Sequence, residues 1–537
     1  MLARAQSIAA LRANFQWAIP DRFNIGVDIC DKHAALTPNA PAIVDVAADM
    51  SHVTYSFADL RDLSSQCANL LANMVSQGDR VAVLLPQSID TAVVHIGALK
   101  LGCISLPLFT LFGPDALLHR LQDSGAKVVV TNAEGMAKIA AIRAKLPNLV
   151  YVLCTDCAQE SQPDFRALCA VQNREFTPVD TAAEDPALLI YTSGTTGNPK
   201  GALHAHRVLL GHLPGVEMSH DFLPQPGDKI WTPADWAWIG GLLDVLMPAL
   251  HHGIPVVAHR FTKFDALRAA ALIRAHGIRN AFLPPTALKM MRAAGVGALP
   301  MRSVASGGET LGAALIDWGK TTFGVTINEF YGQTECNMIV SSCGSVTPAE
   351  PGVMGFAVPG HDVAVLDENG APTTGEGAIA VRAPNPVVFL EYLNNPQATT
   401  EKFLCKDGAK WLLTGDRGMI MPSGRIKFVG RADDVINSAG YRIGPAEIED
   451  CLLTHPAVRM AGVVGKPDET RGEIIVAFVV LQDGVVETAA LKDEIKAQVK
   501  TKLAAYEAPR EIRVIARLPM TTTGKIIRAE LRRLAAS

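Results

Sequence analysis

The run Tyr191-Thr192-Ser193-Gly194-Thr195-Thr196-Gly197-Asn198-Pro199-Lys200-Gly201 follows the apolar stretch Ala187–Ile190 and combines small hydroxyl residues, glycines and one lysine. Glycines let backbone N–H groups turn inward, hydroxyls add hydrogen-bond donors and the lysine adds a mobile positive charge, a combination that suits a triphosphate. The run is not a Walker A loop, because Asn198-Pro199 separate Gly197 from the lysine. Taken alone, it is equally typical of a flexible surface turn.

Five further motifs follow this run in a fixed order. They are Tyr331-Gly332-Gln333-Thr334-Glu335, Thr414-Gly415-Asp416, Gly430-Arg431-Ala432-Asp433-Asp434, Gly440-Tyr441-Arg442 and Gly524-Lys525. Together they resemble the adenylate-forming enzymes, the superfamily of acyl- and aryl-CoA synthetases, peptide-synthetase adenylation domains and luciferases. The resemblance extends from about Phe15 to Arg532. Over Trp231–Gly253 and the Tyr331 motif, the chain is most similar to acetyl-CoA and medium-chain acyl-CoA synthetases.

Length and hydrophobic pattern predict an α/β fold. A chain of 537 residues is too long for one compact core, so at least two domains are expected. In the first part of the chain, strand-like runs at 80–85, 128–131 and 150–154 alternate with helical ones at 89–101 and 135–146. This alternation predicts α/β layers with parallel strands.

The pattern changes twice further along the chain. From Gly352 to Arg382, short strands with glycine-containing turns are typical of a small β-barrel-like subdomain. After the polar joint at 430–434 the chain has strands and helices of its own. We therefore expect a large N-terminal domain, 1–432, of layered α/β subdomains plus the barrel-like one, and a small mobile α+β C-terminal domain, 433–537.

Composition and charge exclude several classes of protein. With 49% hydrophobic and 19% charged residues and a formal net charge of −4, the chain is typical of a globular protein and has no basic surplus for nucleic acid. No apolar run approaches the ~18 residues of a membrane span, since Leu242–Leu250 is interrupted by Asp244. We expect a cytoplasmic protein, although Arg4 and Arg12, with no acid before Asp21, leave a short organelle-targeting peptide open.

Ten cysteines are spread over the chain, which fits a reducing compartment better than a disulfide framework. Cys154-Thr155-Asp156-Cys157 is a C-x-x-C motif, but no second Cys or His pair follows at the spacing that zinc prefers, so a metal site is disfavoured. We expect most of the ten to be packing residues. Arg528, Arg532 and Arg533 near the end of the chain are expected to form a solvated helix face.

The resemblance to adenylate-forming enzymes implies a ligase with two half-reactions. A carboxylate attacks the α-phosphate of ATP to give acyl-AMP and pyrophosphate, and the acyl group then passes to coenzyme A with release of AMP. The protein mainly positions the reactants and neutralises charge. The family pattern makes Glu335 a ligand of Mg²⁺, Thr334 a contact of the α-phosphate and Lys525 the lysine that reaches the carboxylate and α-phosphate.

The same pattern implies nucleotide-binding roles for further residues. Asp416 resembles the acid that accepts hydrogen bonds from both ribose hydroxyls, and Arg431 and Arg442 resemble arginines that contact the nucleotide in different states. Gly307-Gly308-Glu309 resembles the segment against which adenine packs, although the glycine pair also fits a turn at the end of a strand. The implied nucleotide set is Thr192, Ser193, Gly194, Thr195, Thr196, Gly197, Lys200, Gly307, Gly308, Glu309, Tyr331, Gly332, Gln333, Asp416, Arg431 and Arg442.

Lys525 lies in the small domain and has to leave before a thiol can approach the same carbonyl. The resemblance implies that this domain rotates about a hinge at Asp433, after which Gly440 and Tyr441 line the pantetheine tunnel. Pro519–Lys525 also resembles the context in which a lysine acyltransferase modifies the catalytic lysine and a deacylase restores it. The spacing is equally typical of a turn that only presents the lysine.

The family pattern places Trp238, Ile239, Gly240, Gly307 and Gly332 around the acyl group. Acetate enzymes of this type carry a tryptophan where Gly332 stands. Its absence predicts an open pocket for longer, branched or aromatic acids, with ~0.8 kcal/mol for each methylene that gains apolar contact. Amino-acid-activating relatives hold the substrate ammonium with an aspartate at the position of Gly240, and the sequence indicates no replacement. Trp236 fits core packing as well as it fits the pocket.

Three functions fit these motifs to different degrees. The first is an ATP- and Mg²⁺-dependent acyl-CoA ligase of fatty acid metabolism, with a small carboxylic acid as substrate and coenzyme A as co-substrate. The second is a stand-alone adenylation enzyme that loads a carrier protein. The third, an idle nucleotide-binding regulator, is disfavoured because Glu335, Asp416 and Lys525 are retained. The sequence determines neither the preferred acid nor whether the chain forms a homo-oligomer.

Overall fold

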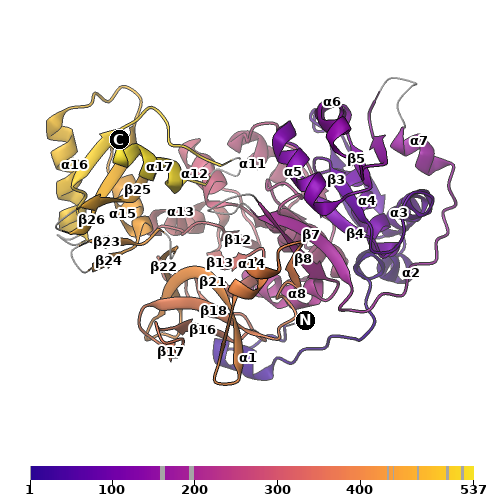
Figure 1. Ribbon diagram of the computed structural model, residues 1–537, viewed down its shortest axis with the longest axis horizontal. Coiled ribbons are helices and arrows are strands. Elements are labelled where there is room, and N and C mark those ends of the chain that lie inside the picture. Colours follow the sequence, from indigo (N-terminus) through magenta and orange to yellow (C-terminus); the bar gives the residue numbers. More distant parts are fainter. Residues whose placement is uncertain are drawn as a thin grey trace. The chain divides into compact units, whose positions relative to one another are not determined.

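The computed structural model describes residues 2–157, 164–192, 199–431, 434–438, 441–468, 471–503, 507–521 and 525–537. The chain forms two compact units, residues 1–362 with 382–412 and residues 363–381 with 413–537. Figure 1 shows the helices and strands of both units, coloured along the chain. The mixed α/β class predicted from the sequence is confirmed.

The first sheet of the larger unit is mostly parallel. Its strands, in spatial order, are β19 (Glu391–Tyr392), β8 (Lys200–Ala205), β7 (Pro186–Thr192), β4 (Ile104–Pro107), β3 (Arg80–Leu84), β5 (Val128–Thr131) and β6 (Tyr151–Cys154). From β6 to β7 the neighbours are parallel, whereas β8 pairs antiparallel with β7 and with β19. The strands predicted at 80–85, 128–131 and 150–154 are confirmed as β3, β5 and β6.

The second sheet is parallel in its centre and antiparallel at both edges. Its strands, in spatial order, are β15 (Phe356–Ala357), β14 (Asn337–Ser341), β13 (Ile327–Gln333), β12 (Ser303–Gly307), β11 (Asn280–Phe282), β9 (Ile230–Trp231), β10 (Val256–Ala258), β1 (Pro41–Val46) and β2 (His52–Ser56). The antiparallel pairs are β15–β14, β14–β13 and β1–β2. The carboxyl ends of β12 and β13 therefore lie at the same edge of the sheet.

Helices cover both faces of both sheets, because alternate strand residues point to opposite faces. Ala82 and Leu84 of β3 face α5 (Pro114–Ser124) and α6 (Ala133–Ile142). Val81 and Val83 belong to the central core, which reaches Ile230 of the second sheet. That core includes α3 (Phe57–Ala72), α4 (Ile89–Lys100), α8 (Val208–Ser219), the π-helix η3 (Leu242–Leu246) and α10 (Met247–His251). α11 (Ala266–Ala275), α12 (Pro285–Ala293) and α13 (Ala313–Phe323) cover the outer face of the second sheet.

Short helices complete this unit. They are α1 (Ile8–Asn14), η1 (Val27–Asp31), α2 (Lys32–Leu36), η2 (Arg143–Lys145), α7 (Phe165–Ala170), α9 (Ile239–Gly241) and α14 (Pro396–Glu401). Helix starts follow local sequence signals: Ser56 and Asp59 form a reciprocal capping box at α3, and the Ser88 hydroxyl caps α4. Among the residues described, no helix is both long and apolar enough to cross a bilayer.

A small antiparallel sheet follows, as predicted for the barrel-like subdomain. Its strands are, in spatial order, β17 (Pro372–Thr373), β16 (Val363–Leu366), β18 (Gly377–Ala383), β21 (Ala409–Ile420) and β20 (Phe403–Lys406), with β22 (Ile426–Arg431) also paired to β21. The boundary between the two compact units falls within β18 and β21.

The last sheet has its own helices. Its strands are, in order, β24 (Tyr441–Ile443), β23 (Ile436–Ser438), β26 (Gly472–Leu481) and β25 (Val458–Asp468), with β27 (Glu511–Val514) parallel to β26. The helices are α15 (Pro445–Leu453), α16 (Ala489–Lys502) and α17 (Arg528–Ala536). The α+β character expected of this region is confirmed.

One prediction for α17 is wrong. Arg532 lies 3.0 Å from the Asp434 carboxylate, and Arg528 lies 2.6 Å from Glu449 and 3.7 Å from Asp434. Asp434 and Glu449 are buried, so these two arginines neutralise buried acids instead of forming a solvated face.

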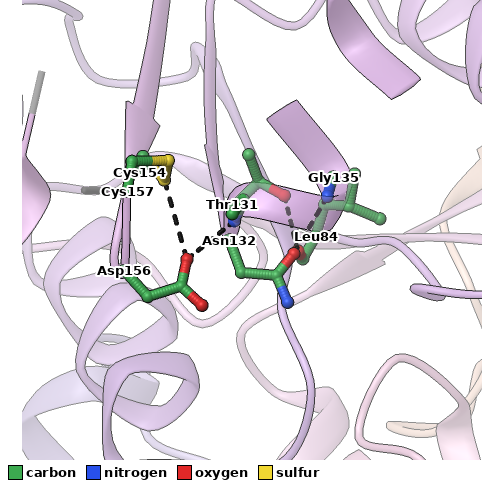
Figure 2. The surroundings of a disulfide bond; sticks show 8 residues. Leu84, Thr131, Asn132, Gly135, Cys154, Asp156 and Cys157 are labelled. Carbon is green, nitrogen blue, oxygen red and sulfur yellow. Dashed lines mark hydrogen bonds between the residues drawn. A yellow bond between two sulfur atoms is a disulfide. The ribbon is translucent and has the colours of Figure 1, made fainter. Parts of the chain in front are cut away.

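The cysteines divide into two groups. Of the eight free cysteines, seven are buried, as expected for packing residues. Cys154 and Cys157, in contrast, form a disulfide at the end of β6, which the sequence did not indicate (Figure 2). The Asp156 carboxylate accepts a hydrogen bond from the backbone N–H of Ala133 at the start of α6. Cys154 and Cys157 are therefore bonded to each other and are not free thiols.

Candidate active site

The predicted phosphate loop connects the antiparallel strands β7 and β8. Thr192 pairs with Lys200 across this hairpin, and its hydroxyl donates to the Lys200 carbonyl at 3.5 Å. Both ends of the loop are therefore held by the first sheet. Ser193, Gly194, Thr195, Thr196 and Gly197 lie outside the described residues.

Glu335 lies in the turn between β13 and β14 of the second sheet and is buried. The Tyr392 hydroxyl donates a hydrogen bond to its carboxylate, and the Lys402 ammonium lies 4.0 Å from the same oxygen. Lys402 also donates to the side-chain oxygen of Gln333 at 3.4 Å. The carboxylate is thus oriented by a hydroxyl and lies beside a positive charge.

Tyr392 connects two of the predicted site residues that come from different sheets. The Lys200 ammonium lies 5.3 Å from the centre of the Tyr392 ring, within cation–π range, while the hydroxyl of the same ring contacts Glu335. The backbone N–H of Phe389 also donates to the Glu335 carbonyl at 2.9 Å. The structure therefore brings the lysine that follows the phosphate loop close to the predicted metal ligand.

The predicted adenine segment follows β12. Gly307 pairs with Phe330 of β13, so Gly308 and Glu309 emerge at the same sheet edge as Tyr331 and Gln333. Gly308 has a φ of 98°, which favours glycine, and it is exposed. Both of the earlier interpretations, a strand-end turn and an adenine platform, agree with this geometry.

The predicted acyl-pocket residues meet a group of aromatic rings. A Cβ at Gly240 would lie 2.8 Å from the Phe282 ring, and a Cβ at Gly307 would lie 2.5 Å from the Phe330 ring. These two rings contact each other with centroids 5.3 Å apart. Gly240 and Gly307 therefore border one continuous aromatic surface, although they lie 67 positions apart in the sequence.

Trp236 and Trp238 differ in how deeply they are buried. Trp238 is half-buried and lies 5.3 and 5.9 Å from the rings of Phe109 and Phe112. Trp236 is 1% exposed and belongs to the central core, which decides between its two earlier interpretations in favour of packing. Ile239 is half-buried and packs against the same core.

The neighbouring backbone leaves no room for a side chain at Gly332. A Cβ there would lie 1.6 Å from the carbonyl oxygen of Asn337, in the antiparallel strand β14. A side chain at this position would thus run into backbone. Whether Gly332 borders the acyl group stays a prediction.

Two acids flank the Trp238–Gly240 segment. Burial raises the pKa of Asp235 to about 6, opposed by the Ala237 backbone N–H, which donates to its carboxylate at 2.8 Å. Burial also raises the pKa of Asp244, and the hydrogen bond with His212 acts in the opposite direction.

In the smaller unit, Asp416 and Arg431 are cross-strand partners on β21 and β22. The Arg431 guanidinium lies 3.4 Å from the Asp416 carboxylate. Asp416 is a buried residue. Thr414 accepts a hydrogen bond from the Asp416 backbone N–H at 3.1 Å. The predicted ribose acid is thus held rigidly, next to a predicted nucleotide arginine.

The remaining predicted residues lie near the end of the chain. Lys525 is exposed; its backbone carbonyl accepts a hydrogen bond from the Thr521 backbone N–H at 2.7 Å, and its backbone N–H donates to the Thr521 hydroxyl at 3.0 Å. Tyr441 and Arg442 belong to β24. Asp433 and Gly440 lie outside the described residues. Thr334 is half-buried in the turn that carries Glu335.

Sequence reasoning missed Tyr392 and Lys402. Tyr392 lies in the two-residue strand β19, and Lys402 follows α14. Neither stands in a motif that the sequence singled out, and only the fold brings them to Glu335.

Comparison with known proteins gives matches over most of the chain. Residues 30–393 match the family described as AMP-binding enzyme, and residues 447–525 match the AMP-binding enzyme C-terminal domain. Acyl-coenzyme A synthetase ACSM2B, mitochondrial, of Homo sapiens is 32% identical, covering 97% of this chain and 92% of the relative. Acetyl-coenzyme A synthetase of Bacillus subtilis (strain 168) is 33% identical, covering 95% and 90%.

Solved structures agree with these matches. Brucella canis acyl-CoA synthetase has a TM-score of 0.75 at 34% identity and covers 99% of both chains. The anthranilate CoA ligase AuaEII in complex with anthranoyl-AMP has a TM-score of 0.85 at 26% identity, covering 96% of this chain and 98% of its own. ATP-bound MatB from Rhodopseudomonas palustris has a TM-score of 0.82 at 26% identity, covering 95% and 99%.

Proposed function

The chain belongs to the AMP-binding enzyme family and is an AMP-forming acyl-CoA synthetase, and we propose that it activates a short- or medium-chain, branched or aromatic carboxylic acid. The aromatic surface at Gly240 and Gly307, formed by Phe282 and Phe330, supports a largely apolar acyl group. The structural neighbour that carries anthranoyl-AMP supports room for a ring.

The observation that carries this proposal is the convergence of Lys200 and Glu335 on Tyr392. Adenylation needs positive charge where the phosphates of ATP develop negative charge, together with a fixed carboxylate for the metal ion. Lys200 supplies the charge at the end of the phosphate loop, and Thr334 stands beside Glu335. Asp416, positioned by Thr414, is the proposed ribose ligand. The ATP-bound relative supports the use of ATP.

The residues present fit Mg²⁺. Glu335 offers a buried carboxylate whose orientation is fixed by a second residue, and hard oxygen ligands are those that Mg²⁺ prefers. The ion would supply charge neutralisation at the phosphates. The Lys402 ammonium, 4.0 Å from the carboxylate, adds a second positive charge beside the proposed phosphate site.

The thioester step is assigned by the family pattern. We keep as proposals the boundary between domains 1–432 and 433–537, the hinge at Asp433, and the tunnel for coenzyme A at Gly440 and Tyr441. Lys525 is proposed to serve the first half-reaction only, together with Arg442. Acylation of Lys525 also stays a proposal, because the two hydrogen bonds between Lys525 and Thr521 would explain the spacing without a modifying enzyme.

Pyrophosphate release tests the proposal directly. The protein is incubated with ATP, Mg²⁺ and a panel of linear, branched and aromatic acids, each with and without coenzyme A. We expect acid-dependent pyrophosphate release, and thioester formation only with coenzyme A. Acyl-AMP that reaches a carrier protein but never coenzyme A would instead favour the carrier-loading function, and no release with any acid would contradict both.

A further inference from the structure

A buried histidine–aspartate pair lies behind the predicted acyl pocket. His212 of α8 and Asp244 of η3 are joined by a hydrogen bond of 2.7 Å between Nε2 and Oδ1. The His212 side chain is 1% exposed, and that of Asp244 is 9% exposed. Neither residue belongs to the motifs that define the nucleotide site.

The pair carries a net negative charge when Asp244 is ionised. The Met338 backbone N–H points at His212 Nδ1 at 3.4 Å, so Nδ1 acts as an acceptor and the proton of the ring is on Nε2. The imidazole is then neutral and donates to Asp244 Oδ1. Among the described residues, no lysine or arginine lies within salt-bridge distance of the Asp244 carboxylate.

The second oxygen of Asp244 faces the pocket segment. A Cβ at Gly240 would lie 3.4 Å from Asp244 Oδ2, beside the Phe282 ring. Oδ2 accepts no hydrogen bond within the part of the chain that the structure describes, and it is not fully enclosed, since the Asp244 side chain keeps 9% exposure. A bound substrate that covered this oxygen without donating to it would leave a desolvated and unpaired acceptor, which is unfavourable.

Helix geometry explains this placement. Asp244 follows Gly240 by four positions, which puts the two on one helix face, and the absent side chain at Gly240 leaves the carboxylate uncovered. The helix here is of the wider π type over Leu242–Leu246, a form that is frequent at functional sites.

Resting on the proposed function, we propose that Asp244 Oδ2 is a specificity determinant that accepts a hydrogen bond from a hydroxyl or amino group on the acyl chain or ring of the substrate. The carboxylate is acceptor-only, so it favours acids that carry a donor. An unsubstituted acid would leave the oxygen buried and unpaired, and sites of this kind reject analogues that lack the donor.

The test compares acids matched in shape. Pyrophosphate release is measured for benzoate against its ortho, meta and para hydroxy and amino derivatives, and for butyrate against beta-hydroxybutyrate. We expect kcat/KM to be higher by about 10- to 100-fold for at least one donor-bearing acid than for its parent, as for a hydrogen bond to a charged group. Asp244→Leu should abolish this preference, mainly by lowering kcat/KM for the donor-bearing acid.

Two further variants separate specificity from stability. Asp244→Asn keeps the shape of the side chain and removes its charge, so it should lower the preference for amino-substituted acids while the protein stays folded. Asp28→Asn alters another His–Asp hydrogen bond, with His251, away from Gly240, and should leave the preference unchanged. Equal kcat/KM for every matched pair in the wild type, with activity present, would overturn the role of Asp244 and leave the ligase function standing. Absence of activity with every acid would overturn both.

Discussion

The hydroxyl of Tyr392 donates a hydrogen bond to the carboxylate of Glu335, 57 positions earlier in the chain. The two residues come from different sheets, and their contact fixes the orientation of the proposed Mg²⁺ ligand.

Tyr392→Phe should therefore weaken the use of Mg²⁺. Loss of a residue that orients a metal ligand typically lowers metal affinity or activity by about 10- to 100-fold. We expect a higher Mg²⁺ concentration for half-maximal pyrophosphate release, with little change in the midpoint of thermal unfolding. Tyr55→Phe, which removes a half-buried hydroxyl from β2, is the control. An unchanged Mg²⁺ dependence would show that Tyr392 does not position Glu335.

Lys525→Ala should abolish acyl-AMP formation and largely spare thioesterification of supplied acyl-AMP. Lys525 is exposed and contacts Thr521 through its backbone, so the substitution leaves these two hydrogen bonds in place. The two half-reactions are measured separately, with Lys492→Ala on α16 as control. Equal losses in both would refute the assignment of Lys525 to the first step alone.

Asp416→Asn should raise KM for ATP by about 10- to 100-fold, because hydrogen bonds to a charged acceptor are lost. The substitution keeps the side-chain shape next to Arg431. Glu376→Gln is the matched control, since it removes the carboxylate that pairs with the neighbouring Arg417 at 2.7 Å. If both variants raise KM equally, Asp416 acts through the sheet and not through the ribose.

Gly332→Ala should destabilise the larger unit by about 1–3 kcal/mol, because the new methyl group would collide with the backbone of Asn337. A tryptophan at this position should therefore disturb β13 and β14 as well as substrate choice. Gly297→Ala, where no atom lies within 4 Å of the new methyl group, should be neutral or slightly stabilising. Urea unfolding measures both, and equal midpoints would contradict the predicted collision.

Asp235→Asn should change stability in a pH-dependent way. Burial raises the pKa of Asp235 from 3.8 to about 6, so the folded chain holds a proton that the unfolded chain releases between these values. Wild-type stability therefore falls as pH rises across this range. The thermal midpoint of Asp235→Asn should rise relative to the wild type between about pH 4 and pH 6 and then stay level. A constant difference across pH would show that Asp235 does not titrate this way.

The sequence predicted what depends on local pattern. Alternation and periodicity placed β3, β5 and β6 close to their observed bounds, since neighbouring residues determine them. Contacts between residues far apart in the sequence produce no local pattern from which they could be predicted. The partner of Arg532 is Asp434, 98 positions earlier, so a helix that is basic by sequence proved to be neutralised.

The site divides in the same way. Motifs identified Glu335 and Lys200, but Tyr392, which contacts both, lies in a strand of two residues with no pattern of its own. Asp244 was noticed only as a charge that interrupts an apolar run. Its importance appears once helix geometry places it four positions after Gly240, a signal that was present in the sequence.

The anchoring of Asp434 by Arg528 and Arg532 has a practical consequence for observing turnover. Residue 434 follows directly on the proposed pivot, and the two arginines fasten it to α17, whose last residue is next to Ser537. If the proposed rotation takes place, a fluorophore at Ser537 would move with α17, and energy transfer to a second dye on the larger unit would report the change between half-reactions.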